Sequence, residues 1–345
     1  MPIAHIPRNL VQQMAEHGID VRDVVLYITS ACNLRCAHCY VGDSLLDAAV
    51  RYDGADLSAL LTSFGSLDRI TILGGEPLLH PDINAITQAA LDANISERRI
   101  TSNLTNFFHF DVQRFSRSWL TICGSLDGAT ASVHDKIRGV GSFDQTLSNL
   151  AHLVTLGYDL EITHTVTART ISDIWEMIAL CREIGITKLN LHKISKHGNA
   201  TANEDLLVQP EDWVALRREL HSKTSSSPRA GRHTLQLRIP VLFASPDEYR
   251  DMLAADKYWP MANGSYYCSG EGHRMVLYPD RRIYMSSEFF GTESFVGSIE
   301  GEKFMFNESI ANEIRLAEQS KKLGSTKKGN LIELSYSFKD IRFVV

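Results

Sequence analysis

Three cysteines lie within eight residues of one another near the start of the chain, at Cys32, Cys36 and Cys39. They are spaced C-x3-C-x2-C and directly follow the apolar run 24–28. A cysteine thiolate is a soft ligand, so three on one short loop suit a zinc ion or an iron–sulfur cluster. A closed zinc site needs a fourth ligand, and the sequence has no second C-x2-C pair. Three ligands would leave one iron of a cubane cluster open, as substrate chemistry requires.

The composition limits the classes of function. The chain has 345 residues, 44% of them hydrophobic, which suits one large α/β domain with an appendage. A net charge of −6 argues against nucleic acid or an anionic membrane as the main partner. The sequence has no apolar run of membrane-spanning length and no N-terminal signal pattern. Six cysteines, three of them in one loop, favour a reducing compartment, so we expect a cytoplasmic protein.

Apolar strands alternate with amphipathic helices through the first part of the chain, which predicts a parallel sheet with crossover helices. Ser142 begins a capping-box pattern, and Gly157 and Gly185 follow expected helices. Six βα units are too few to close a TIM barrel. We therefore expect an α/β fold, a partial (βα)6 TIM-like barrel open on one side and preceded by a short helix at 7–21. Strands are expected at 24–29, 69–74, 98–102, 120–126, 160–167 and 188–194.

The alternation stops after residue 194, which indicates a change of organisation. We expect the barrel to occupy residues 1–200 and a smaller α+β extension to occupy residues 201–345. The extension is expected to contain a helix at 210–220, a loop at 221–233, a strand at 235–243, a hairpin at 275–285 turning at Pro279-Asp280, a loose segment at 321–330 and a final strand at 331–345.

Further chemistry-bearing residues follow the expected strands, where a parallel barrel places its functional groups. Gly74-Gly75-Glu76-Pro77 follows the second strand. Its glycines let the backbone approach a ligand, and strand-end carbonyls with a carboxylate can receive an ammonium group. Asn103 ends the third strand, and Ser125 lies near the end of the fourth.

Four motifs follow the cysteines in a fixed order: GGEP at 74–77, SLDG at 125–128, HD-x2-RG at 134–139 and GSF at 141–143. Together they resemble the radical S-adenosylmethionine (SAM) enzymes. The similar branch is the SPASM/twitch type, with sulfatase maturases, peptide-modifying enzymes and antibiotic-tailoring enzymes, and the likeness covers roughly residues 24–194. The resemblance implies that Cys32, Cys36 and Cys39 hold a [4Fe–4S] cluster whose fourth iron binds SAM.

The resemblance also implies a SAM-binding set. Tyr40 would approach the adenine, and Glu76 with the glycine backbone would hold the methionine amino group. Arg138 is a candidate for the SAM carboxylate, because a guanidinium fork fits a carboxylate. A surface salt bridge is the alternative for Arg138. The full expected set is Tyr40, Gly74, Gly75, Glu76, Asn103, Ser125 and Arg138, with Asn103 and Ser125 contacting the ribose and the amino-acid end.

Two of the expected strands supply candidates for contact with the substrate. The strand 188–194 presents either Asn190 and His192 or Lys193 to the cavity, depending on its parity. His192 and Lys193 are candidate catalytic residues, because such side chains pair with substrate carboxylates or move protons. Polar residues satisfied at the barrel rim are the alternative. Likewise, the strand 160–167 presents either Glu161, Thr163 and Thr165 or His164.

Cys268 precedes the expected hairpin at 275–285. Relatives with a cysteine-rich extension bind auxiliary clusters there, but residues 284–288 carry no cysteine. We therefore expect a degenerate extension without an auxiliary cluster. Cys268 then either packs or donates a hydrogen atom to a substrate radical, which would give epimerisation; we expect packing. We also expect packing roles for Cys123 and Cys181.

These observations favour an enzyme that cleaves SAM and abstracts hydrogen from a substrate C–H bond. The missing auxiliary ligands favour a redox-neutral outcome, such as decarboxylation, epimerisation, elimination or rearrangement, on a small sugar- or nucleoside-like natural-product intermediate. A ribosomally made precursor peptide, presented by a leader-binding partner, is the alternative substrate. A non-catalytic iron–sulfur sensor is the alternative function. Flavodoxin or ferredoxin is the expected electron donor.

Overall fold

The computed structural model describes residues 2–3, 6–43, 50–116, 119–224, 235–240, 243–247, 259–260, 266–267, 274–285, 287, 293, 295–310, 326–328, 331–333 and 340–344. The α-helices are α1 (Leu10–Glu16), α3 (Gly54–Ser63), α4 (Ile83–Asp92), α5 (Ala131–Arg138), α6 (Ser142–Thr155), α7 (Ile174–Ile184) and α8 (Pro210–Thr224). Short 3-10 helices lie at η1 (Pro77–Leu79), η2 (Ile171–Asp173), η3 (Gly198–Ala202) and η4 (Glu204–Leu206).

The longer strands are β2 (Asp23–Tyr27), β4 (Leu67–Leu73), β5 (Ile95–Ser102), β6 (Thr121–Ser125), β7 (Asp159–Val166), β8 (Lys188–Lys193), β9 (Gln236–Pro240), β13 (Arg274–Leu277), β14 (Arg282–Tyr284), β15 (Gly297–Glu300), β16 (Lys303–Phe306) and β19 (Asp340–Val344). Shorter ones are β1 (Pro2–Ile3), β3 (Arg51–Tyr52), β10 (Phe243–Ala244), β11 (Trp259–Pro260), β12 (Tyr266–Tyr267), β17 (Thr326–Lys328) and β18 (Leu331–Glu333).

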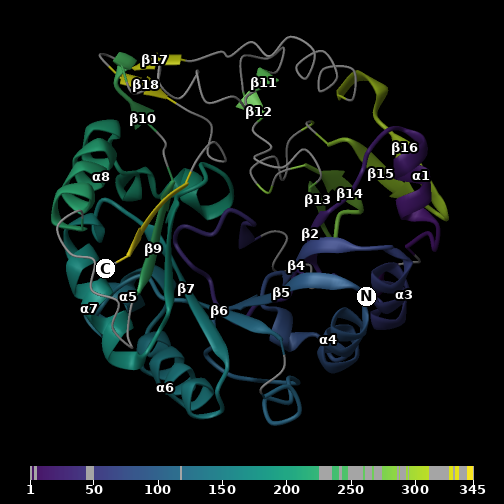
Figure 1. Ribbon diagram of the computed structural model, residues 1–345, viewed down its shortest axis with the longest axis horizontal. Coiled ribbons are helices and arrows are strands. Elements are labelled where there is room, and N and C mark those ends of the chain that lie inside the picture. The colour runs from purple at the N-terminus through teal and green to yellow at the C-terminus, as the bar shows by residue number, and fades with distance from the viewer. Residues whose placement is uncertain are drawn as a thin grey trace.

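The main sheet of the described chain has the order β16-β15-β14-β13-β2-β4-β5-β6-β7-β8-β9-β19. The six expected strands are β2, β4, β5, β6, β7 and β8, which pair in parallel in this order. These strands follow an arc with helices on its outer side (Figure 1). The predicted α/β fold is confirmed, within a mixed sheet that carries additional C-terminal strands.

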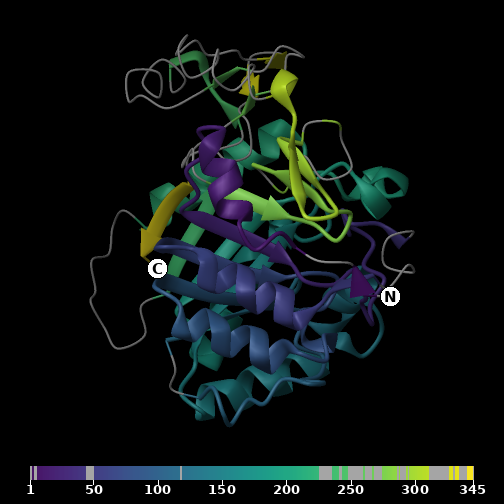
Figure 2. The same cartoon turned by 90° about the vertical axis from the view of Figure 1, so that its right-hand side faces the viewer.

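Strands from the C-terminal part extend this sheet at both edges. β13 pairs in parallel with β2, and β9 pairs in parallel with β8. The predicted hairpin is confirmed as β13 and β14, which are antiparallel. β15 and β16 continue it, beside α1 (Figure 2). The division of the chain into two domains at residue 200 stays a prediction.

Some predicted element ends were wrong for local reasons. α8 runs to Thr224, so the first residues of the expected loop at 221–233 are helical. The expected strand at 331–345 is two strands, β18 and β19, in different sheets. Ser142 is not the cap of α6: the carboxylate of Asp135 accepts from the backbone N–H of Gly141 at 2.7 Å and of Phe143 at 2.9 Å. The expected end of α7 is confirmed, since Gly185 has a φ of +88°.

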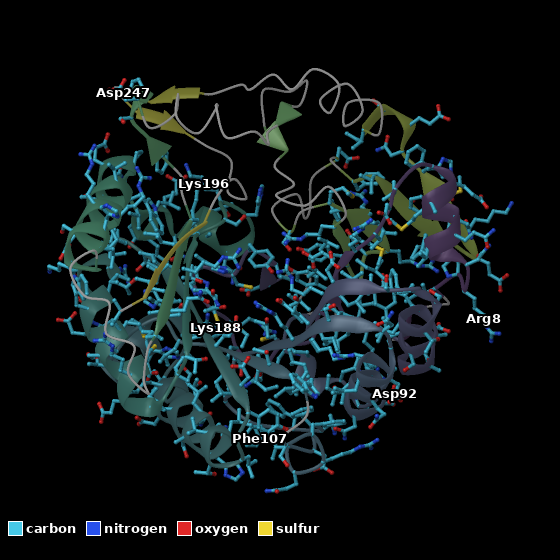
Figure 3. All side chains as sticks on the ribbon, viewed as in Figure 1. Arg8, Asp92, Phe107, Lys188, Lys196 and Asp247 are labelled. Carbon is cyan, nitrogen blue, oxygen red and sulfur yellow. The ribbon has the colours of Figure 1, made fainter. Side chains whose placement is uncertain are left out.

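The two faces of the sheet differ in chemistry. On the helix side, a Cβ at Gly124 would meet Leu150 of α6 and Ile162 of β7, so alternate residues there pack against helices. On the other, concave face, Glu161 accepts hydrogen bonds from Arg99, Lys188 and Asn190 at 3.0, 2.9 and 3.1 Å. Lys188 lies inside the arc in Figure 3. The concave face of β5 to β8 is therefore polar.

No helix among the described residues has both the length and the apolar character needed to cross a membrane.

Candidate functional site

The cysteine loop, residues 28–43, leaves the C-terminal end of β2, as expected. Its three thiols are partly exposed. The loop is held by the backbone: the N–H of Ala37 donates to the carbonyl of Ile137 at 2.8 Å, and the N–H of Asn199 donates to the carbonyl of Cys39 at 2.8 Å. The side chain of Asn199 also donates to the carbonyl of Cys36 at 3.2 Å. The end of α5 and the segment after β8 thus brace the loop.

Burial raises the pKa of the Cys32 thiol to about 11 and that of the Cys36 thiol to about 12. Both thiols therefore stay protonated until a metal displaces their protons. Among the described residues, no three His, Cys, Asp or Glu side chains are grouped closely enough to hold one metal ion. The cysteines of a cubane cluster each bind a different iron, so their sulfur atoms do not have to converge on a single metal ion.

The Gly74-Gly75-Glu76 turn packs directly on the base of the cysteine loop. The N–H of Gly75 donates to the carbonyl of Thr29, and the N–H of Glu76 donates to the carbonyl of Ala31, both at 2.7 Å. A Cβ at Gly75 would lie 2.4 Å from the carbonyl oxygens of both Ser30 and Ala31. The glycine is required because backbone, rather than a movable side chain, occupies that space.

We expect Gly75→Ala to lower the free energy of unfolding by about 1–3 kcal/mol, because an added methyl group overpacks the site. It should also weaken SAM binding, since the displaced backbone belongs to the cysteine loop. Gly65→Ala is the matched control, because a Cβ there meets nothing within 4 Å. Denaturant unfolding and SAM titration check both variants, and parent-like behaviour of Gly75→Ala would contradict the assignment.

Glu76 is completely buried beneath this turn. Its carboxylate accepts hydrogen bonds from the N–H of Leu78 at 3.0 Å, from the hydroxyl of Ser102 at 2.8 Å and from the N–H of Asn103 at 2.8 Å. Burial nevertheless raises the pKa of Glu76 to about 7. A neighbouring cation, such as an amino group, would favour the ionised carboxylate.

Asn103 connects the end of β5 to the cysteine loop. Its side-chain N–H donates to the carbonyl oxygen of the Asn33 side chain at 3.0 Å, and Asn33 donates to the hydroxyl of Thr105 at 2.8 Å. Asn33 and Thr105 were not among the predicted site residues. Asn33 lies inside the cysteine motif, which is the signal that identifies it.

Arg138, at the end of α5, is buried, in contrast to the surface salt bridge considered as the alternative. Its Nε donates to the carboxylate of Asp127. The pKa of Arg138 is raised, with Asp127, Cys36 and Cys39 contributing against the effect of burial. The guanidinium therefore lies within electrostatic reach of the cysteine loop. Asp127 was not among the predicted site residues, although it lies in the SLDG motif two residues after the end of β6.

Tyr40 follows the last cysteine of the loop and belongs to an aromatic group. Its hydroxyl is hydrogen bonded to that of Tyr27, and the Tyr27 ring stacks on that of Tyr278 at 3.8 Å between centroids. Tyr278 also meets Tyr284 edge-on, with centroids 5.5 Å apart. The β2–β13–β14 side of the site is therefore aromatic, whereas the β5–β8 side is polar.

A hydrogen bond on the polar face shows which residues of β8 lie on the concave side of the sheet. Asn190 contacts Glu161, so by alternation His192 shares that face. Lys193 belongs to the other parity, and its ammonium lies 6.0 Å from the centroid of the Phe243 ring. Ser125 lies on β6 at the same face as Cys123, whose thiol is 3.1 Å from the hydroxyl of Thr163.

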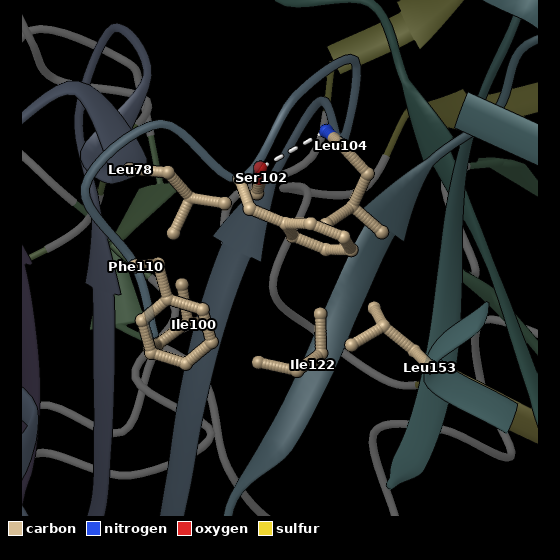
Figure 4. A pocket seen from close by; sticks show the side chains of 8 residues that line it. Leu78, Ile100, Ser102, Leu104, Phe110, Ile122 and Leu153 are labelled. Atoms are coloured by element: carbon tan, nitrogen blue, oxygen red, sulfur yellow. Dashed lines mark hydrogen bonds between the residues drawn. The ribbon is translucent and has the colours of Figure 1, made fainter. Parts of the chain in front are cut away.

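Cys268 lies outside the described residues, so its two interpretations and the absence of an auxiliary cluster stay predictions. Cys181 is buried in the helix-side core. A small pocket on that side is lined mainly by Leu78, Ile100, Phe110, Ile122 and Leu153 (Figure 4). It has no room for a ligand, and its lining carries no group for chemistry beyond Ser102, whose hydroxyl accepts from the N–H of Leu104 at 2.9 Å.

Residues 26–181 match the model of the radical SAM superfamily. Curated relatives include the mycofactocin maturase MftC of Mycobacterium tuberculosis, 28% identical over 230 residues, covering 62% of this chain and 56% of the relative. The AdoMet-dependent heme synthase of Methanosarcina barkeri is 25% identical over 193 residues, covering 55% and 54%. The chain thus spans about half the length of these curated relatives.

Solved structures agree on the fold. SuiB of Streptococcus suis, bound to the precursor peptide SuiA, superposes with a TM-score of 0.62 at 15% identity, covering 89% of this chain and 70% of that one. Native anSMEcpe with bound AdoMet gives a TM-score of 0.62 at 15% identity, covering 88% and 84%. Residues 26–181 of this chain are therefore similar to the radical SAM superfamily, and the chain shares its fold with these two solved structures.

The described side chains fit a [4Fe–4S] cluster and SAM, the cofactors that the sequence motifs imply. Three thiols lie on one braced loop, and the glycine turn that packs against the loop has no room for a side chain. The Asp127 contact uses only Nε of Arg138, and the described part of the chain supplies no hydrogen-bond acceptor for its two terminal nitrogens. A carboxylate and a guanidinium fork thus lie on either side of the loop, as an amino-acid ligand needs.

Proposed function

We propose that this chain binds a [4Fe–4S] cluster through Cys32, Cys36 and Cys39 and uses SAM to abstract hydrogen from a substrate C–H bond. The observation that carries this proposal is that three thiols lie on one loop, which is held through Ala31 to the buried Glu76 and through Ala37 to the residue before the buried Arg138. A carboxylate and a guanidinium held to the same loop match the two charged ends of a free amino acid.

With both cofactors bound, the cluster would supply the electron that cleaves SAM to methionine and a 5′-deoxyadenosyl radical. The residues of this chain bind and orient SAM. Glu76 would accept hydrogen bonds from the methionine ammonium group, and the two terminal nitrogens of Arg138 would donate to its carboxylate. Asn103 would keep the loop in place through Asn33, and Tyr40 would approach the adenine. Ser125 lies on the concave face, where it would donate to the ribose or amino-acid end.

The chemistry of the concave face supports a compact polar substrate. Four neighbouring strands present hydroxyl, thiol, amide and charged groups there; the members are Arg99, Thr101, Cys123, Ser125, Glu161, Thr163, Thr165, Lys188, Asn190 and His192. Such groups match the hydroxyls of a sugar- or nucleoside-like intermediate better than a large apolar ring. His192 is the candidate to pair with a substrate carboxylate, and Lys193 lies on the opposite parity. A redox-neutral outcome stays our proposal.

A peptide substrate is the second candidate, because the comparisons favour it specifically. One relative is named a maturase, and the SuiB structure contains a precursor peptide. This chain would then need a partner that binds the leader segment. In either case a flavodoxin or ferredoxin would supply the electron.

Deuterium transfer tests the substrate class. The reconstituted enzyme is given SAM, reductant and carbon-deuterated candidates, with sugar nucleotides and nucleosides in one set and peptides in the other. Deuterium in 5′-deoxyadenosine from the first set is the expected result. Transfer only from peptides would replace the small-molecule proposal with the second candidate.

A further inference from the structure

The carboxylate of Asp127 joins three separate segments of the site. Asp127 directly follows the SL of the SLDG motif and is completely buried. Its Oδ2 accepts hydrogen bonds from Nε2 of His38 at 2.6 Å and from Nε of Arg138. Its Oδ1 accepts from the backbone N–H of Thr165 at 2.7 Å. One carboxylate therefore connects the cysteine loop, α5 and β7.

The contact with Arg138 determines how that side chain is presented. A guanidinium group is planar, so holding Nε also sets the plane in which its terminal nitrogens lie. Arg138 is almost completely buried, and its other rotamers would break the buried ion pair with Asp127. The terminal nitrogens are thus held in one orientation before any ligand arrives.

The contact with His38 acts on the cysteine loop itself. His38 lies between Cys36 and Cys39, and its side chain is 9% exposed in the pair with Asp127. The neighbouring Ala37 is bound by its backbone to Ile137, one residue before Arg138. The loop and the guanidinium are therefore held to the same carboxylate and to the same helix end.

We propose that Asp127 is a positioning residue for SAM, which fixes the Arg138 fork relative to the cysteine loop so that the SAM carboxylate meets a preformed site. This inference rests on the proposed function, because it assumes that Arg138 receives that carboxylate. The competing account is that Asp127 only stabilises the fold as one partner of a buried ion pair. The two accounts differ in whether the loss of Asp127 acts through Arg138.

The test uses the anaerobically reconstituted full chain and measures SAM affinity by calorimetry, iron content, and the electron paramagnetic resonance spectrum of the reduced protein with and without SAM. Asp127→Asn keeps the shape and removes the charge. We expect it to retain its iron but to bind SAM about 10- to 100-fold more weakly, as is common when a group that orients a ligand-binding side chain is lost. The spectral change caused by SAM should shrink in parallel.

Asp23→Asn is the matched control. Asp23 is also a buried carboxylate on the same sheet that accepts hydrogen bonds from arginine, but its partners are Arg69 and Arg274, and it has no role in the proposed site. It should lose stability while keeping the parent affinity for SAM. If both variants lose stability and neither loses affinity, the purely structural account holds and the positioning proposal is overturned.

A double-mutant cycle provides the sharper test. If Asp127 acts through Arg138, the variant with both Asp127→Asn and Arg138→Gln should bind SAM no more weakly than Arg138→Gln alone. Additive losses would overturn the proposal. Should Asp127→Asn fail to fold, Asp127→Glu decides, because it keeps the charge and displaces the fork; parent-like affinity would then reject the proposal. A parent chain that binds no SAM would reject the proposed function itself, and this inference with it.

Discussion

Cys36→Ala is expected to abolish cluster binding, so that iron after anaerobic reconstitution falls from about four atoms per chain to background. Cys36 is the middle cysteine of the loop, and its carbonyl accepts a hydrogen bond from the Asn199 side chain at 3.2 Å, which holds this part of the loop in place. Two remaining cysteines cannot saturate the three irons that the protein must hold. Formation of 5′-deoxyadenosine from SAM should fall to background in the same variant.

Cys181→Ala is the control for this experiment, because Cys181 is fully buried in the helix-side core, away from the loop. It should lose stability by a packing effect and keep its iron. An iron content near four with an unchanged absorption spectrum in Cys36→Ala would contradict the ligand assignment. A content near eight in the parent that survives the loss of all three loop cysteines would instead reveal a second cluster.

Arg138→Gln is expected to weaken SAM binding without removing the cluster. Hydrogen bonds to a charged group contribute roughly 1.5–3 kcal/mol each, which corresponds to about a 10- to 100-fold loss of affinity. Glu76→Ala should act in the same direction through the methionine ammonium group. SAM titration of the reconstituted variants, with iron analysis on the same samples, checks both.

Arg169→Gln controls for the loss of an arginine. Arg169 forms an exposed ion pair with Asp205, and such pairs contribute about 0–1 kcal/mol. The Arg169→Gln variant should bind SAM with the same affinity as the parent chain. Unchanged affinity in Arg138→Gln or in Glu76→Ala would show that the residue concerned has been assigned wrongly.

The parts of the fold that depend on local pattern could be predicted from the sequence. Each βα unit places an apolar strand before a helix, and the cysteine loop and the GGEP turn follow strand ends that this pattern locates. The cap of α6 could not be found in this way, because Ser142 matched a capping pattern while Asp135, seven residues earlier, accepts the hydrogen bonds. The additional parallel pairing of β13 with β2 joins segments about 250 residues apart, which local periodicity does not report.

In the site, too, local sequence patterns do not report contacts between distant segments. Cysteine spacing is a local property and identified the candidate ligands directly. The role of Asp127 depends on His38, Arg138 and Thr165, which come together only in the folded chain. Which residues of β8 face the concave side depends on the register of β8 with β7. This register places Asn190 beside Glu161 and leaves Lys193 on the other face.

The most direct test of the account is reductive cleavage of SAM by the reconstituted chain. The protein is loaded with iron and sulfide under anaerobic conditions and mixed with SAM and dithionite, and 5′-deoxyadenosine and methionine are quantified. We predict that both products form in equal amounts, and that neither forms when dithionite is omitted or when Cys32, Cys36 and Cys39 are replaced by alanine. A chain that holds its cluster and binds SAM but yields no 5′-deoxyadenosine would contradict the account.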